Sequence, residues 1–535
     1  MKLRKLLLFG GMLAMLLFGA ASCQDKNNDI DPDTLETGTT YMSLVIDLSK
    51  SIDELRLTRA EDDDVHNPKG DWGGRDLIKN VDVYILHPSR GTVQAHSVTQ
   101  IQAPAPGQNS IYVTQPWTVQ PGTGRSIYVV VNNSGAIKDS LDAAATGTGG
   151  DRVAAFEAAY KKAYDYTIDT YAKEEGSPLE DVILMSGQPL SPVQMKAGVT
   201  AAEAAITTAN DINPNKNQFA LTVRRSAARV AVTKGTALEP SANITDAANN
   251  VYGTLTNLKW TYGQFEKKTR VLWDATATVS PTSTKLHFTT KSPNWGYIPS
   301  VANYTTEALD KYDYTFVNNP VYLDDISVLT NNEASVANII NDGKMKFITE
   351  TTHQYGDESA TGYRKGNTPY VMIEAVFSPS AGVWATNEES QYIQGNDLFY
   401  NTTDGKFYAD ETRAKAAVTG TYTAPNDGLI KYTNAKVYYF AWLNPDGVEL
   451  GQFKPDKVFN SPVIRNNIYH INVTGFKRLG FSGNPYNPDT NNNPIPVDPD
   501  DDVPAPDELL KTEETYMSAQ VTVVNWGVHS YGIEF

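Results

Sequence analysis

The residue types that usually carry catalysis or metal binding are present, but their spacing defines no site. The seven histidines, at positions 66, 87, 96, 287, 353, 470 and 529, show no metal-ligand spacing. The glycine-rich stretch 146–150 lacks the Gly-Lys-Ser/Thr ending of a phosphate-binding loop. The acidic run 498–502 contains a proline and lacks the glycine and glutamate of an EF-hand loop. No carboxylate pair stands out as acid and base, so we expect no enzymatic activity, no metal and no cofactor.

One side chain does indicate chemistry by its position: Cys23, the single cysteine of the 535 residues. Residues 1–22 combine a basic start, an apolar run and small residues, which is the pattern of a secretory signal. A thiol directly after such a signal is the attachment point for acyl chains in bacterial lipoproteins. The alternative is an ordinary signal peptide followed by a chance cysteine. We expect a covalent lipid on Cys23, which would anchor an otherwise soluble precursor to a membrane.

A third chemical feature is the charged, turn-rich stretch 51–74. It contains Arg56, Arg59 and the acidic run 61–64. A stretch of this composition is expected to be an exposed loop that proteases can reach.

Composition indicates a globular chain rich in strands and turns. Apolar residues make up 40% and charged residues 20%, while Tyr (29) outnumbers Phe (17). The length favours two large β domains. A net charge of −17 makes binding to nucleic acid phosphate unfavourable. Asp151 is expected to cap a helix, and Thr200 and Glu203 to form a capping box. We expect strands over 41–48, 81–86, 126–131, 182–185, 219–232, 255–262, 270–273, 370–377, 437–443, 468–476 and 516–524.

The most informative pattern is a repeat between the two ends of the chain. Thr-Tyr-Met-Ser occurs at 40–43 and again at 515–518. The alternation that follows has the same phase in both copies. The apolar face consists of Met42, Leu44, Ile46 and Leu48 in the first copy, and of Met517, Ala519, Val521 and Val523 in the second.

This repeat predicts that two segments of the chain fit one groove. Loss of the first segment by cleavage after Arg56 or Arg59 would remove an edge strand and expose a slot. The last segment of another copy could then fill that slot, which makes a head-to-tail filament. The Pro/Asp-rich stretch 484–514 is expected to be an extended, solvated linker that gives the donor reach. The alternative is that both segments are ordinary edge strands of a monomer.

Two groups of residues leave their role open. Arg224, Arg225 and Arg229 either pair with acids at a domain junction or make subunit contacts. Aromatic side chains on alternating strands pack in the core by default, and the alternative is a sugar-stacking surface. With the expected lipid anchor, that alternative would make the chain a surface carbohydrate-binding lipoprotein.

Several motifs resemble those of the fimbrillins of Bacteroidales, in particular the shaft subunits of the minor (Mfa-type) fimbria of Porphyromonas. The resemblance covers most of the chain. It is carried by residues 223–229 (VRRSAAR), 363–370 (YRKGNTPY), 439–444 (YFAWLN), 460–470 (NSPVIRNNIYH), 477–481 (KRLGF) and 516–535.

The resemblance implies a fimbrial shaft subunit on the cell surface, with two transthyretin-like β-sandwich domains and an outer-membrane lipoprotein precursor. It implies cleavage by an arginine-specific protease between Arg59 and Ala60, with Arg56 as competitor, then polymerisation by donation of the C-terminal strand. Expected partners are other copies, tip and anchor subunits, and host or bacterial surface ligands in adhesion and biofilm formation. The expected parts are a signal peptide (1–22), a propeptide with a self-complementing strand (23–59), an acceptor domain (60–222), a C-terminal domain (223–483), a linker (484–514) and a donor strand (515–535).

Overall fold

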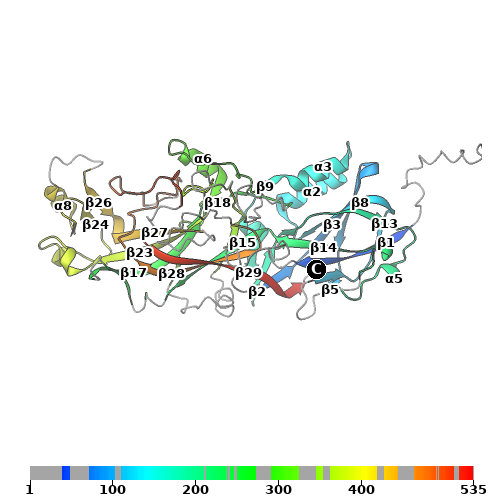
Figure 1. Cartoon of the computed structure of the whole chain (residues 1–535), viewed down its shortest axis with the longest axis horizontal. Helices are drawn as coiled ribbons and strands as arrows, with labels where there is room; N and C mark the ends of the chain where they lie inside the picture. The colour runs from blue at the N-terminus through cyan, green and yellow to red at the C-terminus, as the bar shows by residue number, and fades with distance from the viewer. Residues whose placement is uncertain are drawn as a thin grey trace, which may run out of the picture.

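A computed structural model shows a mainly β protein with an elongated shape (Figure 1). Two large sheets lie one after the other along the long axis. In the described part of the chain, no helix combines the length and apolar character needed to span a membrane. The structure describes residues 39–48, 71–102, 110–209, 212–235, 238, 241–245, 250–272, 291–323, 345–353, 362–418, 427–443, 463–489, 491, 493, 495–510 and 517–533.

The first sheet has ten strands in the order β4-β3-β8-β12-β14-β1-β6-β5, with β13 paired to β8 and β7 paired to β1. This sheet surrounds one apolar core. Side chains from β1, β3, β8 and β14 all belong to the same buried cluster. The strands are β1 (Thr40–Leu48), β3 (Val81–His87), β4 (Thr92–Val98), β5 (Ile101–Gln102), β6 (Ser110–Val113), β7 (Trp117–Val119), β8 (Gly122–Val131), β12 (Met185–Ser186), β13 (Leu190–Met195) and β14 (Gln218–Arg225).

The second sheet has twelve strands in the order β10-β11-β2-β29-β28-β16-β17-β23-β27, with β15, β21 and β22 attached beside this path. Its strands are β2 (Asp71–Ile78), β10 (Ala172–Glu175), β11 (Glu180–Ile183), β15 (Ala227–Lys234), β16 (Ala242–Thr245), β17 (Val251–Gly263), β21 (Val321–Tyr322), β22 (Lys346–Thr349), β23 (Tyr370–Pro379), β27 (Lys436–Trp442), β28 (Asn467–Phe476) and β29 (Met517–Ile533).

Short helices and small sheets cover these two sheets. Asp151 caps α3 by accepting hydrogen bonds from the amides of Val153 and Ala154, and Thr200 and Glu203 form a capping box, so both expectations are confirmed. The helices are α2 (Gly135–Thr146), α3 (Arg152–Lys161), α4 (Ile168–Tyr171), α5 (Ala201–Ala204), α6 (Tyr304–Lys311) and α8 (Glu411–Ala417), with single turns η2 (Pro88–Arg90), η3 (Pro214–Lys216), η5 (Ala381–Val383), η6 (Glu389–Gln391) and η7 (Thr433–Ala435). The small sheets pair β9 (Ala163–Asp165) with β19 (Lys268–Arg270), β18 (Phe265–Glu266) with β20 (Tyr312–Asp313), and β24 (Leu398–Asn401) with β25 (Lys406–Tyr408) and β26 (Leu429–Tyr432).

The chain passes from the first sheet to the second at Ser226, between β14 and β15. The single long strand expected over 219–232 is therefore two strands. The two sheets are also less separate in sequence than the expected division at 222 and 223 implies. Strands β2, β10 and β11 precede that division, yet they belong to the second sheet.

The described residues of the segment 484–510 differ from the solvated linker that its composition predicts. Tyr486 is fully buried, and its hydroxyl donates to the carbonyl of Pro504 at 3.2 Å. The carboxylate of Asp500 accepts hydrogen bonds from the amides of Asp427 and Gly428. The expectation of a solvated stretch is wrong here, because aspartates and asparagines satisfy backbone groups while scattered apolar residues pack on the domain.

Candidate functional site: the β1 groove and the C-terminal strand

The site predicted from the repeat has two parts, the position of β1 and the position of β29. β1 runs parallel to β14 from Ser43 to Leu48. On its other side it pairs antiparallel with β7 near its start and with β6 near its end. β1 is therefore an interior strand and not the edge strand expected from the sequence. Its removal would leave unpaired backbone groups on both sides of a slot.

The floor of this slot is apolar. Met42, Leu44 and Ile46 have no exposed surface, and Leu48 is 2% exposed. All four belong to the buried cluster of the first sheet, where they meet side chains such as Val83 from β3 and Val129 from β8. Burial of each such side chain is worth about 1.5–3 kcal/mol. We call the slot that β1 fills, between β14 on one side and β6 and β7 on the other, the β1 groove.

The start of the groove is polar and centres on Asn217. Asn217 is buried and has a φ of +52°, a conformation that asparagine tolerates better than most residues. Its side-chain amide nitrogen lies 3.1 Å from the hydroxyl of Thr40, 3.0 Å from the carbonyl of Tyr41 and 2.9 Å from the carbonyl of Lys196. The Thr40 hydroxyl donates to the Lys196 carbonyl at 2.6 Å and accepts from the amide of Val199 at 3.1 Å.

A second hydroxyl of β1 is also fixed. The side chain of Ser43 donates to the carbonyl of Val113 on β6 at 2.8 Å, and its own amide donates to the carbonyl of Asn217 at 3.1 Å. The sequence did not predict the roles of Asn217 and Val113. The role of Asn217 depends on the turn in which it lies, and that of Val113 on its backbone carbonyl, and neither feature leaves a pattern in the sequence. The available signal was the repeat itself, which conserves a threonine and a serine three residues apart at both ends of the chain.

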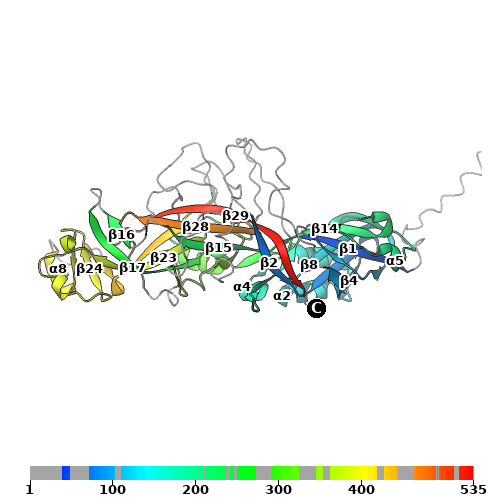
Figure 2. The ribbon, with the colours of Figure 1, turned by 90° about the horizontal axis from the view of Figure 1, so that it is seen from below.

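The second copy of the repeat occupies a different place in the structure. β29 lies between β28, to which it is antiparallel, and β2, to which it is parallel. Met517 is buried and faces Phe476 in the ladder. Figures 1 and 2 show β29 in red alongside β28 and running on to β2. Within one chain, the two copies of the repeat are therefore not brought together. In the ladder, Ala519, Val521 and Val523 stand opposite Val473, Ile471 and Tyr469.

Buried ion pairs hold β2 at the junction of the two sheets. The guanidinium of Arg225 pairs with the carboxylate of Asp76, and both side chains are almost fully buried. Arg229 pairs in the same way with Asp181, which also accepts from Arg75 at 3.2 Å. Burial raises the pKa of Asp181 to about 6, against the lowering effect of Arg229 and Arg75. Arg225 and Arg229 therefore pair with acids at the junction, which is the first of the two roles considered for the three arginines.

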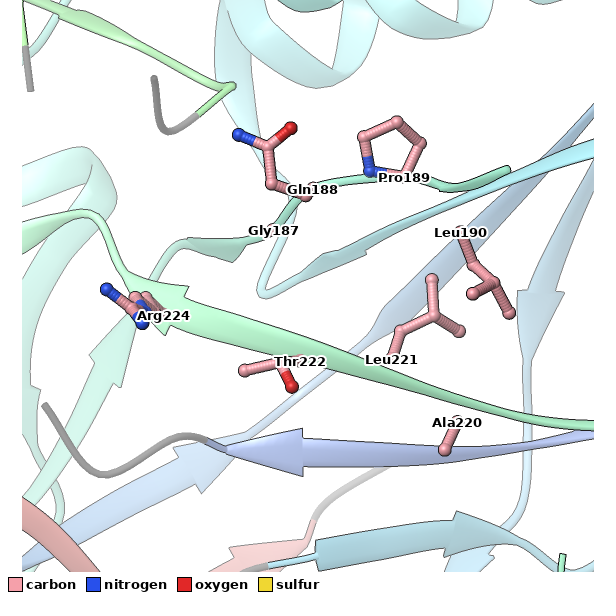
Figure 3. A pocket seen from close by; sticks show the side chains of 8 residues that line it. All are labelled: Gly187, Gln188, Pro189, Leu190, Ala220, Leu221, Thr222 and Arg224. Atoms are coloured by element: carbon pink, nitrogen blue, oxygen red, sulfur yellow. The ribbon is translucent and has the colours of Figure 1, made fainter. Parts of the chain in front are cut away.

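A small opening of about 250 Å³ lies beside β14 (Figure 3). It is bordered by the segment 187–190 on one side and by Ala220, Thr222 and Arg224 on the other. The lining contains no serine, cysteine, histidine or carboxylate. In the described part of the chain, no group of three or more His, Cys, Asp or Glu could hold a metal ion.

The described histidines are packed rather than grouped. His353 and His470 are buried, and burial lowers the pKa of each to about 4. His96 stacks on Trp117 with ring centroids 4.6 Å apart, and burial also lowers its pKa. These contacts match the structural interpretation of the histidines. Cys23, Arg56, Arg59 and Ala60 lie outside the described residues.

Comparison with known proteins defines first the class and then the family. Residues 430–532 match the model of the major fimbrial subunit protein type IV, fimbrillin, C-terminal. This region includes β27, β28 and nearly all of β29. Two curated relatives, both described as minor fimbrium subunit Mfa1 of Porphyromonas gingivalis, are 33% identical over 560 aligned residues and cover 100% of each chain. The chain belongs to this family of fimbrial subunits, as its motifs predict.

Among solved structures, the likeness is weaker. A fimbrilin (FimA) of Porphyromonas gingivalis is 13% identical, with a TM-score of 0.40 and coverage of 92% of this chain and 98% of that chain. The tip fimbrial protein Mfa3 of the same organism is 11% identical, with a TM-score of 0.34 and coverage of 91% and 100%. The family alone places the chain among cell-surface fimbrial subunits.

Proposed function

We propose that this fimbrial subunit forms the shaft of the fimbria by proteolytically activated strand exchange. The observation that carries the proposal is the place of β1. It is an interior strand whose apolar face lies in the core of the first sheet, yet its only covalent link to the rest of the fold is the stretch 49–70, which contains Arg56 and Arg59. Cleavage after Arg59, or after Arg56, would cut that link. The groove could then be filled by the strand 517–523 of another copy.

The donor segment fits this role by sequence and by position. It repeats the Thr-Tyr-Met-Ser start of β1 and continues with the same alternation. It follows every other described element of the fold in sequence. Because donor and acceptor sites are different surfaces of one chain, the contact is heterologous and continues as a filament.

Export, anchoring and adhesion complete the proposal. The signal-like segment 1–22 and Cys23 support passage as a lipoprotein to the outer membrane, where the lipid would hold the precursor until cleavage removes it. The mature filament would extend from the cell with tip and anchor subunits at its ends, and would serve adhesion to host or bacterial surfaces and biofilm formation. The carbohydrate-binding alternative gains no specific support, because among the described side chains Tyr322 is the one exposed aromatic.

The deciding experiment is digestion of purified precursor with an arginine-specific protease, followed by an unheated SDS gel and sequencing of the new N-terminus. We expect a ladder of bands only after a cut at Arg59 or Arg56. The double variant Arg56→Ala/Arg59→Ala should give no ladder, whereas Arg90→Ala, at an exposed arginine on η2, should behave like the wild type. Deletion of 516–535 should abolish the ladder and leave a folded monomer. A single monomer band after a confirmed cut would overturn the proposal.

A further inference from the structure

The polar start of the β1 groove holds two hydroxyl groups three residues apart. Thr40 is enclosed by Asn217, by the carbonyl of Lys196 and by the amide of Val199. Ser43 donates to the carbonyl of Val113 on the opposite wall. Neither hydroxyl-bearing residue has exposed surface. A strand that entered this groove without these hydroxyls would remove the acceptor of the Val199 amide and one donor each from the carbonyls of Lys196 and Val113, which is costly in a buried site.

The apolar face of a donor strand selects a register only weakly. Side chains alternate with a period of two, so after a slip of two residues three of the four core positions are again apolar, and Thr515 or Asn525 takes the fourth. The donor side chains Ala519, Val521 and Val523 are also smaller than those of Leu44, Ile46 and Leu48, whose places they would take. Neighbouring registers would thus bury three of these side chains instead of four, and the apolar face favours one register by a single side chain. A feature that occurs once per strand would distinguish the registers further.

The repeated hydroxyl pair is such a feature. Thr515 and Ser518 have the spacing of Thr40 and Ser43, and the residues between them are the same two, tyrosine and methionine. After a slip of two residues the position of Thr40 would be occupied by Glu513 or Met517. Either side chain is larger than threonine and cannot reproduce its hydrogen bonds to Asn217 and the Lys196 carbonyl.

We propose that the site formed by Asn217, Lys196, Val199 and Val113 is a recognition site for a Thr-x-x-Ser segment, and that it sets the register of the strand donated by a second copy of this chain. Thr515 of the donor takes the place of Thr40, and Ser518 takes the place of Ser43. The donor then runs in the same direction as β1, parallel to β14 of the acceptor. This inference rests on the strand exchange proposed above and specifies which residues read the incoming strand.

The first test compares two isosteric changes in the full-length chain. Thr515→Val keeps the shape of the side chain and removes the hydroxyl. Thr512→Val makes the same change three residues earlier, outside the repeat. After protease activation, filaments of Thr515→Val should dissociate about tenfold faster on dilution into detergent than those of Thr512→Val, because the amide of Val199 loses its acceptor. Ser518→Ala should have an effect in the same direction. Equal dissociation of Thr515→Val and Thr512→Val would overturn the proposal.

The second test reads the register directly with a pair of cysteines. The mature chain would contain no cysteine, since Cys23 lies before the cut. Asp47 stands opposite Ser110 in the antiparallel ladder, and the proposed register puts Thr522 of the donor at the position of Asp47. Ser110→Cys/Thr522→Cys should therefore form disulfides between subunits. Ser110→Cys/Gln520→Cys, with its second cysteine two residues away, should form few, because the Cα atoms would be too far apart.

The outcomes separate the two proposals. Efficient cross-linking by the Thr522 pair, reduced when Thr515→Val is added, supports the recognition site. Filaments that form but cross-link as well through the Gln520 pair would overturn the register and leave strand exchange standing. Absence of filaments from the wild-type chain after a confirmed cut would overturn both.

Discussion

The first and the last described strands of the chain fill two slots of different construction. β1 spans nine residues and lies between β14 and the pair β6 and β7, with its apolar face in the first core. β29 spans seventeen residues and lies between β28 and β2, across the junction of the sheets. β1 starts at the polar site around Asn217, whereas β29 follows the packed segment 484–510.

The comparison shows that both copies of the repeat are interior strands. Neither is an edge strand, because each pairs with a neighbouring strand on both sides. Under the strand-exchange proposal, a precursor therefore contains a filled acceptor groove and a donor strand already paired within its own chain. Assembly would require β1 to leave the first slot and β29 to leave the second. Each of the following changes loosens one slot and leaves the other intact.

The largest effect is expected from a charge in the β1 groove. Ile46 has no exposed surface, so Ile46→Asp would place a carboxylate in an apolar core at a cost of several kcal/mol, of order 4 or more. We expect β1 to leave its groove without cleavage, and the undigested precursor to form the ladder of bands on an unheated gel.

The matched control is Tyr41→Asp. Tyr41 lies on the same strand, on the opposite face from Ile46, and its side chain is partly exposed. This variant should remain monomeric until the protease is added. An Ile46→Asp precursor that is as stable and as monomeric as Tyr41→Asp would contradict the view that the apolar face of β1 keeps the groove filled.

A smaller effect, on the other slot, is expected from the ion pair that anchors β2. Asp76→Asn would leave the buried guanidinium of Arg225 without its counter-charge, which costs about 3–5 kcal/mol. Because β2 flanks β29, amide exchange of β29 should increase, while that of β1 changes little. Urea denaturation and hydrogen exchange measure the two parts of this prediction.

Glu157→Gln serves as the control for the ion pair. Glu157 faces Lys161 on α3 at 3.9 Å, and both side chains are well exposed. The loss of such a surface pair should change the free energy of unfolding by less than about 1 kcal/mol. A similar small change for Asp76→Asn would mean that the junction does not depend on the charge of Asp76.

Much of the strand content could be predicted from alternation alone. The expected strands over 81–86, 370–377 and 437–443 coincide with β3, β23 and β27. The long strand over 219–232 failed as a unit because nothing in its alternation marks Ser226, where the chain changes sheets. The cap at Asp151 marks where α3 begins but not where it ends, at Lys161, after which the chain continues as β9, α4 and β10.

The candidate site was predictable in its apolar half only. Alternation identified Met42 and Leu44 as core residues, which the structure confirms. The position of β1 inside the sheet depends on its pairing with β6 and β14, which are separated from it by about sixty and one hundred and seventy residues in sequence. Local patterns carry no information about such partners. The burial of 484–510 was missed for a related reason, because its aspartates act as caps for loops far away in the chain.

The smallest effect we expect distinguishes the two slots by pH. His470 lies on β28, where it stands opposite Thr522 of β29, whereas β1, β6, β7 and β14 contain no histidine. Burial lowers the pKa of His470 from its usual 6.5 to about 4. The unfolded chain therefore binds the proton more tightly than the folded one, and stability falls as the pH drops from about 6.5 towards 4. The full loss would be about 3 kcal/mol for this residue, of which about 2 kcal/mol would be reached at pH 5.

Hydrogen exchange at pH 7.5 and 5 would measure the effect strand by strand. We expect β28 and β29 to lose protection at the lower pH to a greater extent than β1, although Asp181 on β11, whose raised pKa favours the folded chain in acid, offsets part of the loss. His470→Gln removes the titrating group and keeps a side chain able to hydrogen-bond to Thr233, so it should flatten the pH dependence of β28 and β29. Burial also lowers the pKa of His353 to about 4. This residue lies elsewhere in the C-terminal part and is unchanged in the variant, so a residual pH dependence of stability should remain. An unchanged slope in His470→Gln would show that acid acts on the β29 slot through other groups.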